Sequence, residues 1–261
     1  MAEWKGIFAL NDPYGMSQEK ERSIHGKHPV LEAIDAGKSI DRVLVRKKGG
    51  KGVEEVMEAA RTRGIPFQKV PSVKLDKIVK GNHQGIVALM TPVSFADPDE
   101  LLATAFDQGR DPLFLLLDGV TDVRNFGAVC RTAECCGVDA LFVPARGSAR
   151  INDDAVRTSA GALMRIPVAR CFQLHTLPPR LADHGVPTVA CTEKDAMPIE
   201  DVDLRGPLAV VMGDEEKGVS EAVLKGVRQK IRLPLKGAID SLNVSVASGM
   251  ILYEILRQRK G

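Results

Sequence analysis

The order of hydrophobic and polar residues divides the first third of the chain into alternating helices and strands. Apolar positions recur at helical spacing in three segments that each end in a glycine: HPVLEAIDAG (28–37), GVEEVMEAARTRG (52–64) and SVKLDKIVKG (72–81). Between and after them lie three strand-like segments: DRVLVRK (41–47), IPFQKV (65–70) and GIVALMTPV (85–93). This alternation predicts a small α/β unit whose sheet is largely covered by helices.

The remainder of the chain repeats the alternation around longer apolar runs. LFLLLDGV (113–120) is continuously apolar at first, which is typical of a parallel strand covered on both faces. Further strands are predicted at 139–144, 165–170, 187–192, 208–212 and 229–235. Helices are predicted at about 125–136, 154–163 and 241–259, and a further helix is predicted to end at about residue 184. We therefore expect a second α/β domain with a mainly parallel sheet.

The segment between the two patterns is acidic. Asp97 is a candidate N-cap and Pro98 suits the first helical position, so a short helix is expected there. The predicted organisation is a flexible N-terminal extension (1–21), a first domain (22–93), a linker (94–111) and a second domain (112–261).

Composition restricts the class of protein. No apolar run approaches the roughly 18 residues that a membrane span needs, and the first residues lack the features of a secretory signal, so we expect a cytoplasmic protein. The cysteines are odd in number and form no C-x-x-C pair, which indicates neither a disulfide framework nor a zinc site. We expect them to be buried thiols. They are Cys130, Cys135, Cys136, Cys171 and Cys191.

Charge is unevenly distributed along the chain. The formal net charge is +2, but residues 22–93 hold fourteen Lys or Arg and seven Asp or Glu, a difference of +7. Residues 94–111 hold one Arg and five acids, a difference of −4. The basic first domain indicates a polyanionic partner, and a solvated lysine-rich face is the alternative.

Polar loops follow three of the predicted strands, where ligands of parallel sheets usually bind. They are DGVTDVRNFGAVCRTAECCG, GDEEKGVS and KGAIDSLNVSVASG. The chain has no G-x-G-x-x-G after its first long strand, no G-x-x-x-x-G-K-[ST] and no H-E-x-x-H, so dinucleotide, P-loop and metal-hydrolase sites are disfavoured and no metal is expected. The density of Ser and Asn from Ser241 to Ser248 indicates capping or ligand contact.

Taken together, the three loops resemble motifs 1, 2 and 3 of the SpoU branch of the SPOUT methyltransferases, which methylate ribose 2′-hydroxyls of RNA. The matching stretches are NFGAVCRTAECCGVDALFV, VMGDEEKGVS and LPLKGAIDSLNVSVASGMILYE. IHGKHPVLEAI and HQGIVALMTPV are similar to the RNA-binding domain of the subgroup that includes the 23S ribosomal RNA guanosine-2′-O-methyltransferase. The resemblance implies a deep trefoil knot, which topology alone argues against. It also implies S-adenosylmethionine as cofactor, structured RNA as partner (ribosomal RNA favoured, transfer RNA possible) and a homodimer built on the last helix, without a membrane.

The resemblance also implies site residues. Cofactor contacts are implied for Thr192, Gly213, Leu233 and Leu242, and catalytic roles for Asn125, Arg131, Glu215, Ser241 and Asn243. In-line methyl transfer requires an aligned ribose oxygen, a neutralised phosphate and a removed proton. Arg131 suits the phosphate; it is also implied as the base, for which a guanidinium is poorly suited.

Plainer roles remain open for several of these residues. Arg131 could pair with Glu134 or Asp122, Asn125 or Ser241 could cap a helix, and Glu215 could organise its own turn. Gly213 could serve a turn that needs positive φ. Two positions depart from the family pattern, Val123 in place of proline and Asp214 in place of a small or neutral residue. A different class of function, a knotted RNA-binding or ribosome-assembly protein without turnover, is the alternative to the enzyme.

Overall fold

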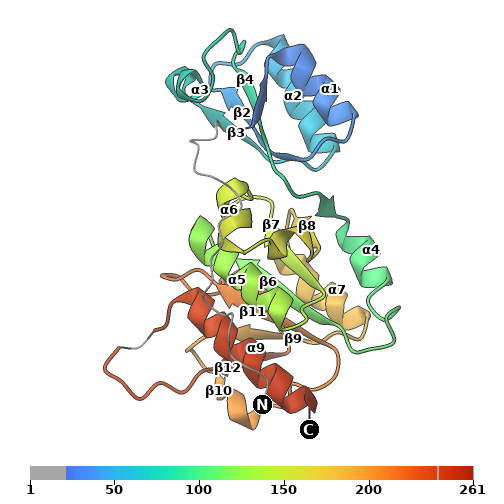
Figure 1. Cartoon of the computed structure of the whole chain (residues 1–261), viewed down its shortest axis with the longest axis vertical. Coiled ribbons are helices and arrows are strands. Elements are labelled where there is room, and N and C mark those ends of the chain that lie inside the picture. The colour runs from blue at the N-terminus through green and yellow to red at the C-terminus, as the bar shows by residue number, and fades with distance from the viewer. Residues whose placement is uncertain (1–21, 240, 261) are drawn as a thin grey trace.

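The computed structural model describes residues 22–239 and 241–260, and the expected N-terminal extension lies outside them. Two sheets, each with its own helices, organise this part of the chain. Figure 1 shows the smaller unit stacked on one end of the larger one. The predicted α/β class and the mainly parallel second sheet are confirmed.

The smaller unit is built on a sheet of order β1-β4-β2-β3. Its elements are β1 (Ser23–His25), α1 (Lys27–Asp35), β2 (Ile40–Arg46), α2 (Lys51–Thr62), β3 (Phe67–Val70), α3 (Ser72–Ile78) and β4 (Ile86–Met90). Alternation along β2 sends Val43 and Val45 into the cluster formed with α1 and α2, and Leu44 into the cluster formed with α3. Both faces of the sheet are therefore covered, as the sequence predicts. β1 was not predicted, because three residues carry too little periodicity.

The larger unit is built on a sheet of order β10-β12-β9-β11-β6-β7-β8-β5, in which the strand pairs of the described residues are parallel. Its strands are β5 (Phe95–Ala96), β6 (Leu113–Asp118), β7 (Ala140–Pro144), β8 (Val168–Cys171), β9 (Thr188–Cys191), β10 (Met197–Pro198), β11 (Leu208–Gly213) and β12 (Gln229–Arg232). Its helices are α4 (Pro98–Ala103), α5 (Val123–Cys135), α6 (Asp153–Thr158), α7 (Leu177–Asp183), α8 (Glu221–Leu224) and α9 (Val244–Lys260). β5 and α4 lie in the segment expected to link the domains, and Asp97 caps α4 as predicted.

Helices cover both faces of this sheet. Leu113, Leu115 and Leu117 of β6 pack into the cluster that includes α5, α6 and α9. Phe114 and Leu116 point to the opposite face, whose cluster includes α4, α7 and α8. The continuous apolar run of β6 therefore reflects burial on both sides, as expected for a central parallel strand.

Three local expectations were wrong. The helix expected at 154–163 ends at Thr158, because Ala160 and Gly161 adopt positive φ (51° and 84°), and a short 3₁₀ turn (Ala162–Met164) follows. The last helix begins at Val244 rather than at Ser241. Cys135 is exposed, and not a buried thiol, while Cys130 and Cys171 are buried.

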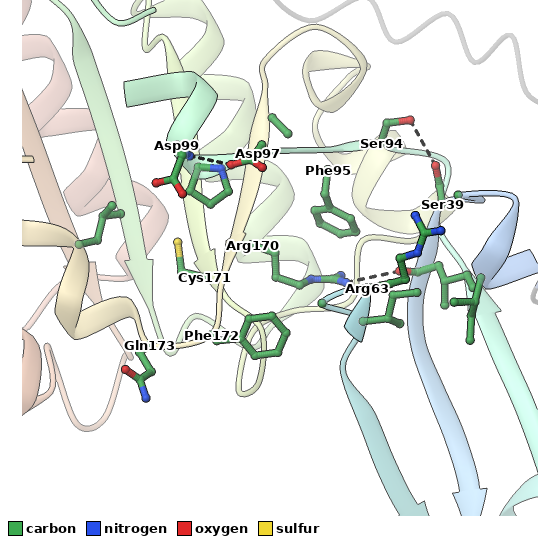
Figure 2. A pocket seen from close by; sticks show the side chains of 18 of the residues that line it. Ser39, Arg63, Ser94, Phe95, Asp97, Asp99, Arg170, Cys171, Phe172 and Gln173 are labelled. Carbon is green, nitrogen blue, oxygen red and sulfur yellow. Dashed lines mark hydrogen bonds between the residues drawn. The ribbon is translucent and has the colours of Figure 1, made fainter. Parts of the chain in front are cut away.

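A buried ion pair joins the two units. Arg170, at the end of β8, donates to the carboxylate of Asp41 on β2 (3.2 Å) and to the backbone oxygen of Ile40 (3.4 Å). Figure 2 shows this arginine reaching toward the smaller unit beside the ring of Phe95, whose centroid lies 3.6 Å from the guanidinium carbon. Arg150, which the resemblance offers as a possible contact with RNA bound to the partner subunit, lies 3.8 Å from the same carboxylate of its own chain. The joint therefore places the smaller unit against loops at the carboxyl ends of β7 and β8.

None of the helices in the described part of the chain has both the length and the apolar character needed to cross a membrane.

Candidate functional site

Three polar loops leave neighbouring parts of the same sheet edge. β6 and β11 are adjacent and parallel, and Asp118 at the end of β6 lies beside Gly213 at the end of β11. β9 and β12 follow in the sheet order on the far side of β11. Because carboxyl ends of parallel strands share one edge, the loops after β6, β11 and β12 converge there.

The loop after β6 leads into α5 through a side-chain cap. Asp122 accepts a hydrogen bond from the backbone nitrogen of Asn125 (2.8 Å), which makes Asp122 the N-cap and places Asn125 in the first turn. The alternative role of Asn125 as a cap is therefore wrong. Its side-chain amide reaches across to the next loop.

The loop after β11 is a tight turn closed by backbone and side-chain hydrogen bonds. Asp214 and Gly218 bond to each other through their backbones (3.1 and 2.9 Å). The carboxylate of Asp214 also accepts from the backbone nitrogens of Glu216 (3.0 Å) and Lys217 (2.9 Å). Asp214, one of the two departures from the family pattern, therefore organises this turn, and the alternative that Glu215 does so is wrong.

Gly213 is required by close backbone approach. A Cβ atom placed on it would lie 2.2 Å from the carbonyl carbon of Gly218 and 2.3 Å from the nitrogen of Val219. Its φ is not among the positive values of the described residues, so the positive-φ explanation is wrong. No larger residue fits where β11 enters its loop.

The start of α9 is capped by Asn243. Its Oδ1 accepts from the backbone nitrogen of Ser245 (2.9 Å) and from the hydroxyl of Ser245 (2.5 Å). The cap explains why the helix begins at Val244. Asn243, and not Ser241, is therefore the residue that caps the last helix.

Three predicted site residues from three separate segments of the chain form one hydrogen-bonded cluster. Asn125 Nδ2 donates to Oε1 of Glu215. Asn243 Nδ2 donates to Oδ1 of Asn125 (3.1 Å) and to Oε1 of Glu215 (3.2 Å). Asn125 is thus in direct contact with Glu215, 90 positions later in the chain, and with Asn243, 118 positions later. The cluster offers a carboxylate acceptor and amide groups that suit the hydroxyls of a sugar.

Arg131 lies further along α5. It is exposed, six residues after Asn125 and therefore about 9 Å from it along the helix axis. It forms no hydrogen bond or ion pair with a described residue; Glu134 instead contacts Arg165 (3.7 Å), so the predicted alternative pairings of Arg131 are wrong. Its guanidinium remains available for an anionic substrate. Ser241 is exposed beside Asn243 and likewise has no partner among the described residues.

The predicted cofactor residues follow three adjacent strands. Thr192, Gly213 and Leu233 come at the ends of β9, β11 and β12. These strands are neighbours in the order β12-β9-β11, and each lies about 5 Å from the next. Thr192 is tied to β12 through its backbone nitrogen, which donates to the oxygen of Ile231 (2.9 Å). Leu233 is buried and Leu242 is partly exposed. Backbone groups of strand ends, a glycine without a side chain and two leucines suit the edge and the face of an adenine, so these residues fit the implied cofactor.

Sequence reasoning missed one residue that shapes the site. Asp118 accepts a hydrogen bond from the backbone nitrogen of Ser220 (2.8 Å), which fixes the far end of the loop after β11 to the end of β6. The available signal was an acidic residue directly after an apolar strand and before Gly119. Among the described residues, no group of three or more His, Cys, Asp or Glu is arranged to hold a metal ion.

Comparison with known families assigns both units. Residues 112–253 match the model of the SpoU rRNA methylase family. Residues 23–96 match the model described as RNA 2′-O ribose methyltransferase substrate binding. The chain belongs to the SpoU methylase family. It is accordingly an RNA methyltransferase, and S-adenosylmethionine is the methyl donor of the family.

Named relatives of this SpoU methylase cover nearly its whole length. A putative TrmH family tRNA/rRNA methyltransferase, YacO of Bacillus subtilis, is 34% identical over 94% of this chain and 98% of its own. An uncharacterized tRNA/rRNA methyltransferase of Mycolicibacterium vanbaalenii is 37% identical over 90% of this chain and 76% of its own.

Solved structures share the fold. A crystal structure of an RNA 2′-O ribose methyltransferase is 27% identical, covers 92% of this chain and 89% of its own, and has a TM-score of 0.53. AviRb of Streptomyces viridochromogenes, solved in complex with AdoMet, is 23% identical, covers 92% and 90%, and has a TM-score of 0.57. The expected SPOUT fold is thus confirmed, while the knot stays a prediction.

Proposed function

We propose that this SpoU methylase acts in the cytoplasm and methylates a ribose 2′-hydroxyl of structured RNA, with a guanosine of 23S ribosomal RNA as the favoured target. The observation that carries the proposal is the contact of Asn125, Glu215 and Asn243 at the sheet edge beside the predicted cofactor residues. The resemblance of the smaller unit favours ribosomal RNA. Transfer RNA is the second candidate, because the relatives are named for both substrates.

The residues divide into two groups by their chemistry. Thr192, Gly213, Leu233 and Leu242 would hold S-adenosylmethionine, which supplies an electrophilic methyl group when bound. Asn125, Asn243 and Ser241 would orient the ribose through amide and hydroxyl hydrogen bonds.

Glu215 and Arg131 would handle charge in this reaction. Glu215 is the member of the hydrogen-bonded cluster that can accept the hydroxyl proton, because amides are not bases at neutral pH. Arg131, exposed and unpaired among the described residues, would bind the phosphate next to the reacting sugar.

The test is a methylation assay with labelled S-adenosylmethionine and RNA from cells that lack this gene, followed by mapping of 2′-O-methyl positions. Arg131→Ala should lower turnover by at least about a hundredfold, the scale for one preorganised electrostatic group, with cofactor affinity changed only a few fold. Arg157→Ala, an exposed arginine of α6 that pairs with Asp154, is the matched control and should retain activity. A near wild-type rate in Arg131→Ala would refute its role. Failure of the wild type to bind S-adenosylmethionine in calorimetry would favour the non-catalytic RNA-binding protein.

We also propose that the enzyme is a homodimer formed through α9. Val246, Met250 and Tyr253 of α9 are 50%, 46% and 68% exposed and recur at spacings of four and three residues, so they lie on one face of the helix. The opposite face packs on its own sheet through residues such as Ile251 and Ile255. An apolar stripe of this length on a helix beside the active site suits a second copy of the chain.

Light scattering tests the dimer. Met250→Glu should give a particle near the 28.2 kDa of one chain, whereas the wild type should give twice that mass. Val73→Glu, at an exposed position of α3, introduces the same charge elsewhere and should stay dimeric. A monomeric wild type that methylates RNA would contradict the proposal.

A further inference from the structure

A cavity of about 450 Å³ lies between the two units, where the edge strand β3 faces the loop after β7. Arg42, Phe67 and Lys69 line it from the smaller unit, and Arg146 lines it from the larger. No acidic side chain is among the described residues that line it. Its volume is within the range of small-ligand sites. The larger cavity of about 740 Å³ near Phe172 (Figure 2) differs in having the carboxylates of Asp97 and Asp99 in its lining. Of the four cations that also line it, Arg170 and Arg180 are paired with Asp41 and Asp99.

The cations of the smaller cavity are not all neutralised. Arg42 is paired with Asp41 (2.7 Å), and that carboxylate is shared with Arg170. Lys69 and Arg146 are exposed, and neither forms an ion pair with a described residue. Two cations on opposite walls therefore remain available for an anion that enters between them. A phosphate is well matched to this pair, since guanidinium binds it through a planar fork and ammonium as a point charge.

The aromatic ring of Phe67 is placed among these cations. The guanidinium carbons of Arg61 and Arg146 lie 5.8 Å and 5.6 Å from its centroid. Phe67 is half-buried on the edge strand and also contacts the core of the smaller unit. An aromatic ring beside Arg and Lys is the arrangement on which unpaired bases stack in single-stranded RNA recognition. Packing of the smaller unit's core would account for the ring of Phe67, but it would not account for a cavity lining that is basic and holds no acidic side chain.

The cavity is close to the catalytic cluster. Ala149, in the same loop as Arg146, donates its backbone nitrogen to the oxygen of Val120 (2.8 Å) in the loop that leads to Asn125. β7 lies two strands from β11 in the sheet, so the strands that lead to Arg146 and Glu215 are about 10 Å apart. A strand of RNA held at the cavity would therefore continue directly to the ribose bound at the cluster.

We propose that this cavity binds an unpaired nucleotide that flanks the methylated one, with its phosphate on Lys69 and Arg146 and its base on Phe67. The inference rests on the proposed function for the place of this nucleotide in the reaction. Binding itself requires no turnover, so the site is tested by affinity.

The experiment measures binding of a short fluorescein-labelled single-stranded RNA of mixed sequence to the full chain by anisotropy at several salt concentrations. Lys69→Ala and Arg146→Ala should each weaken binding and reduce the salt slope by about 0.7, the value for one lost phosphate contact on a single strand. Phe67→Leu should weaken binding about fivefold or more with the slope unchanged, and Phe67→Tyr should restore it. Lys77→Ala changes an exposed lysine of α3 that does not line the cavity; it is the control and should leave both quantities unchanged.

Two results would overturn the site. One is an equal loss in Lys77→Ala, which would show a diffuse charge effect. The other is unchanged affinity in both Arg146→Ala and Phe67→Leu. If the wild type binds RNA as expected but methylates none, the proposed function fails while the cavity stands. If it methylates RNA and the cavity variants bind normally, only the cavity proposal fails.

Discussion

Replacement of Asp41 tests the joint between the two units. Its carboxylate is almost fully buried (1% exposed) and contacts Arg170 at 3.2 Å and Arg42 at 2.7 Å. In Asp41→Ala the side chain of Arg170, 9% exposed, would keep its charge without this partner. Burial already lowers the pKa of Arg170 to about 10, and the charge of Asp41 acts in the opposite direction.

The magnitude follows mainly from Arg170 and Arg42, the two partners within hydrogen-bond distance of the carboxylate, since Arg150 lies further away at 3.8 Å. Removal of one member of a buried ion pair costs about 3–5 kcal/mol, because the other charge remains desolvated. Arg42 contributes little to this cost, since its side chain is 27% exposed and can turn to water. Arg170 has a second contact, the backbone oxygen of Ile40, that keeps it partly satisfied. We therefore expect a loss of about 3 kcal/mol, the lower end of the range.

Urea unfolding followed by circular dichroism measures this loss as the shift in midpoint multiplied by the slope. The double variant Asp41→Ala/Arg170→Met should be more stable than Asp41→Ala alone by about 1 kcal/mol or more, because it removes the stranded charge. Asp203→Ala breaks an exposed pair with Arg205 and is the control, for which little shift is expected. A shift in Asp41→Ala as small as in this control, or a double variant that is no more stable, would refute the reasoning.

Two further predictions concern close packing and thiol burial. Gly213→Ala should lower the free energy of unfolding by more than about 3 kcal/mol and abolish S-adenosylmethionine binding, because the added Cβ would lie 2.2 Å from a backbone atom. Gly249→Ala is the control and should be tolerated, since the nearest atom to its Cβ is 3.7 Å away. Equal unfolding midpoints of the two variants would contradict this. Iodoacetamide at pH 8 should alkylate exposed Cys135 first in the native protein, since burial raises the pKa of both Cys171 and Cys191 to about 12 and leaves their thiols protonated. Peptide mass spectrometry measures the order, and rapid modification of Cys171 would show that the thiol is not protected.

Sequence periodicity predicted most of the fold because the main elements are long and buried on defined faces. The apolar run of β6 and the glycine stops after α1 and α2 are strong local signals, and the structure has Gly37 and Gly64 at positive φ (63° and 68°). β1, β5 and β10 have two or three residues each, so no period could reveal them. The early end of α6 was missed because positive φ at Ala160, a residue with a high helix propensity, has no local sequence signal.

The site was less predictable than the fold. The resemblance supplied Asn125, Glu215 and Asn243, but their mutual contact depends on the order β12-β9-β11-β6, which no single segment encodes. Asp214 departs from the family pattern, and residue type alone did not indicate that its carboxylate closes a turn through two backbone hydrogen bonds. Short-range chemistry could be inferred from residue type, and long-range adjacency required the sheet.

The smaller unit lies on the same sheet edge as the catalytic cluster, which affects how RNA can be recognised. Its contacts with Arg170 and Arg146 place it at the carboxyl ends of β8 and β7, on the same edge as the cluster at β6 and β11. β8 and β11 are three strand spacings apart, about 14 Å, so the basic unit and the catalytic loops are close enough for one stretch of RNA to reach both. The buried ion pair of Arg170 and Asp41 joins the two units, and we expect it to favour this separation before RNA binds. A substrate that fits both surfaces is then aligned on binding, and the entropy of ordering the two units does not oppose catalysis.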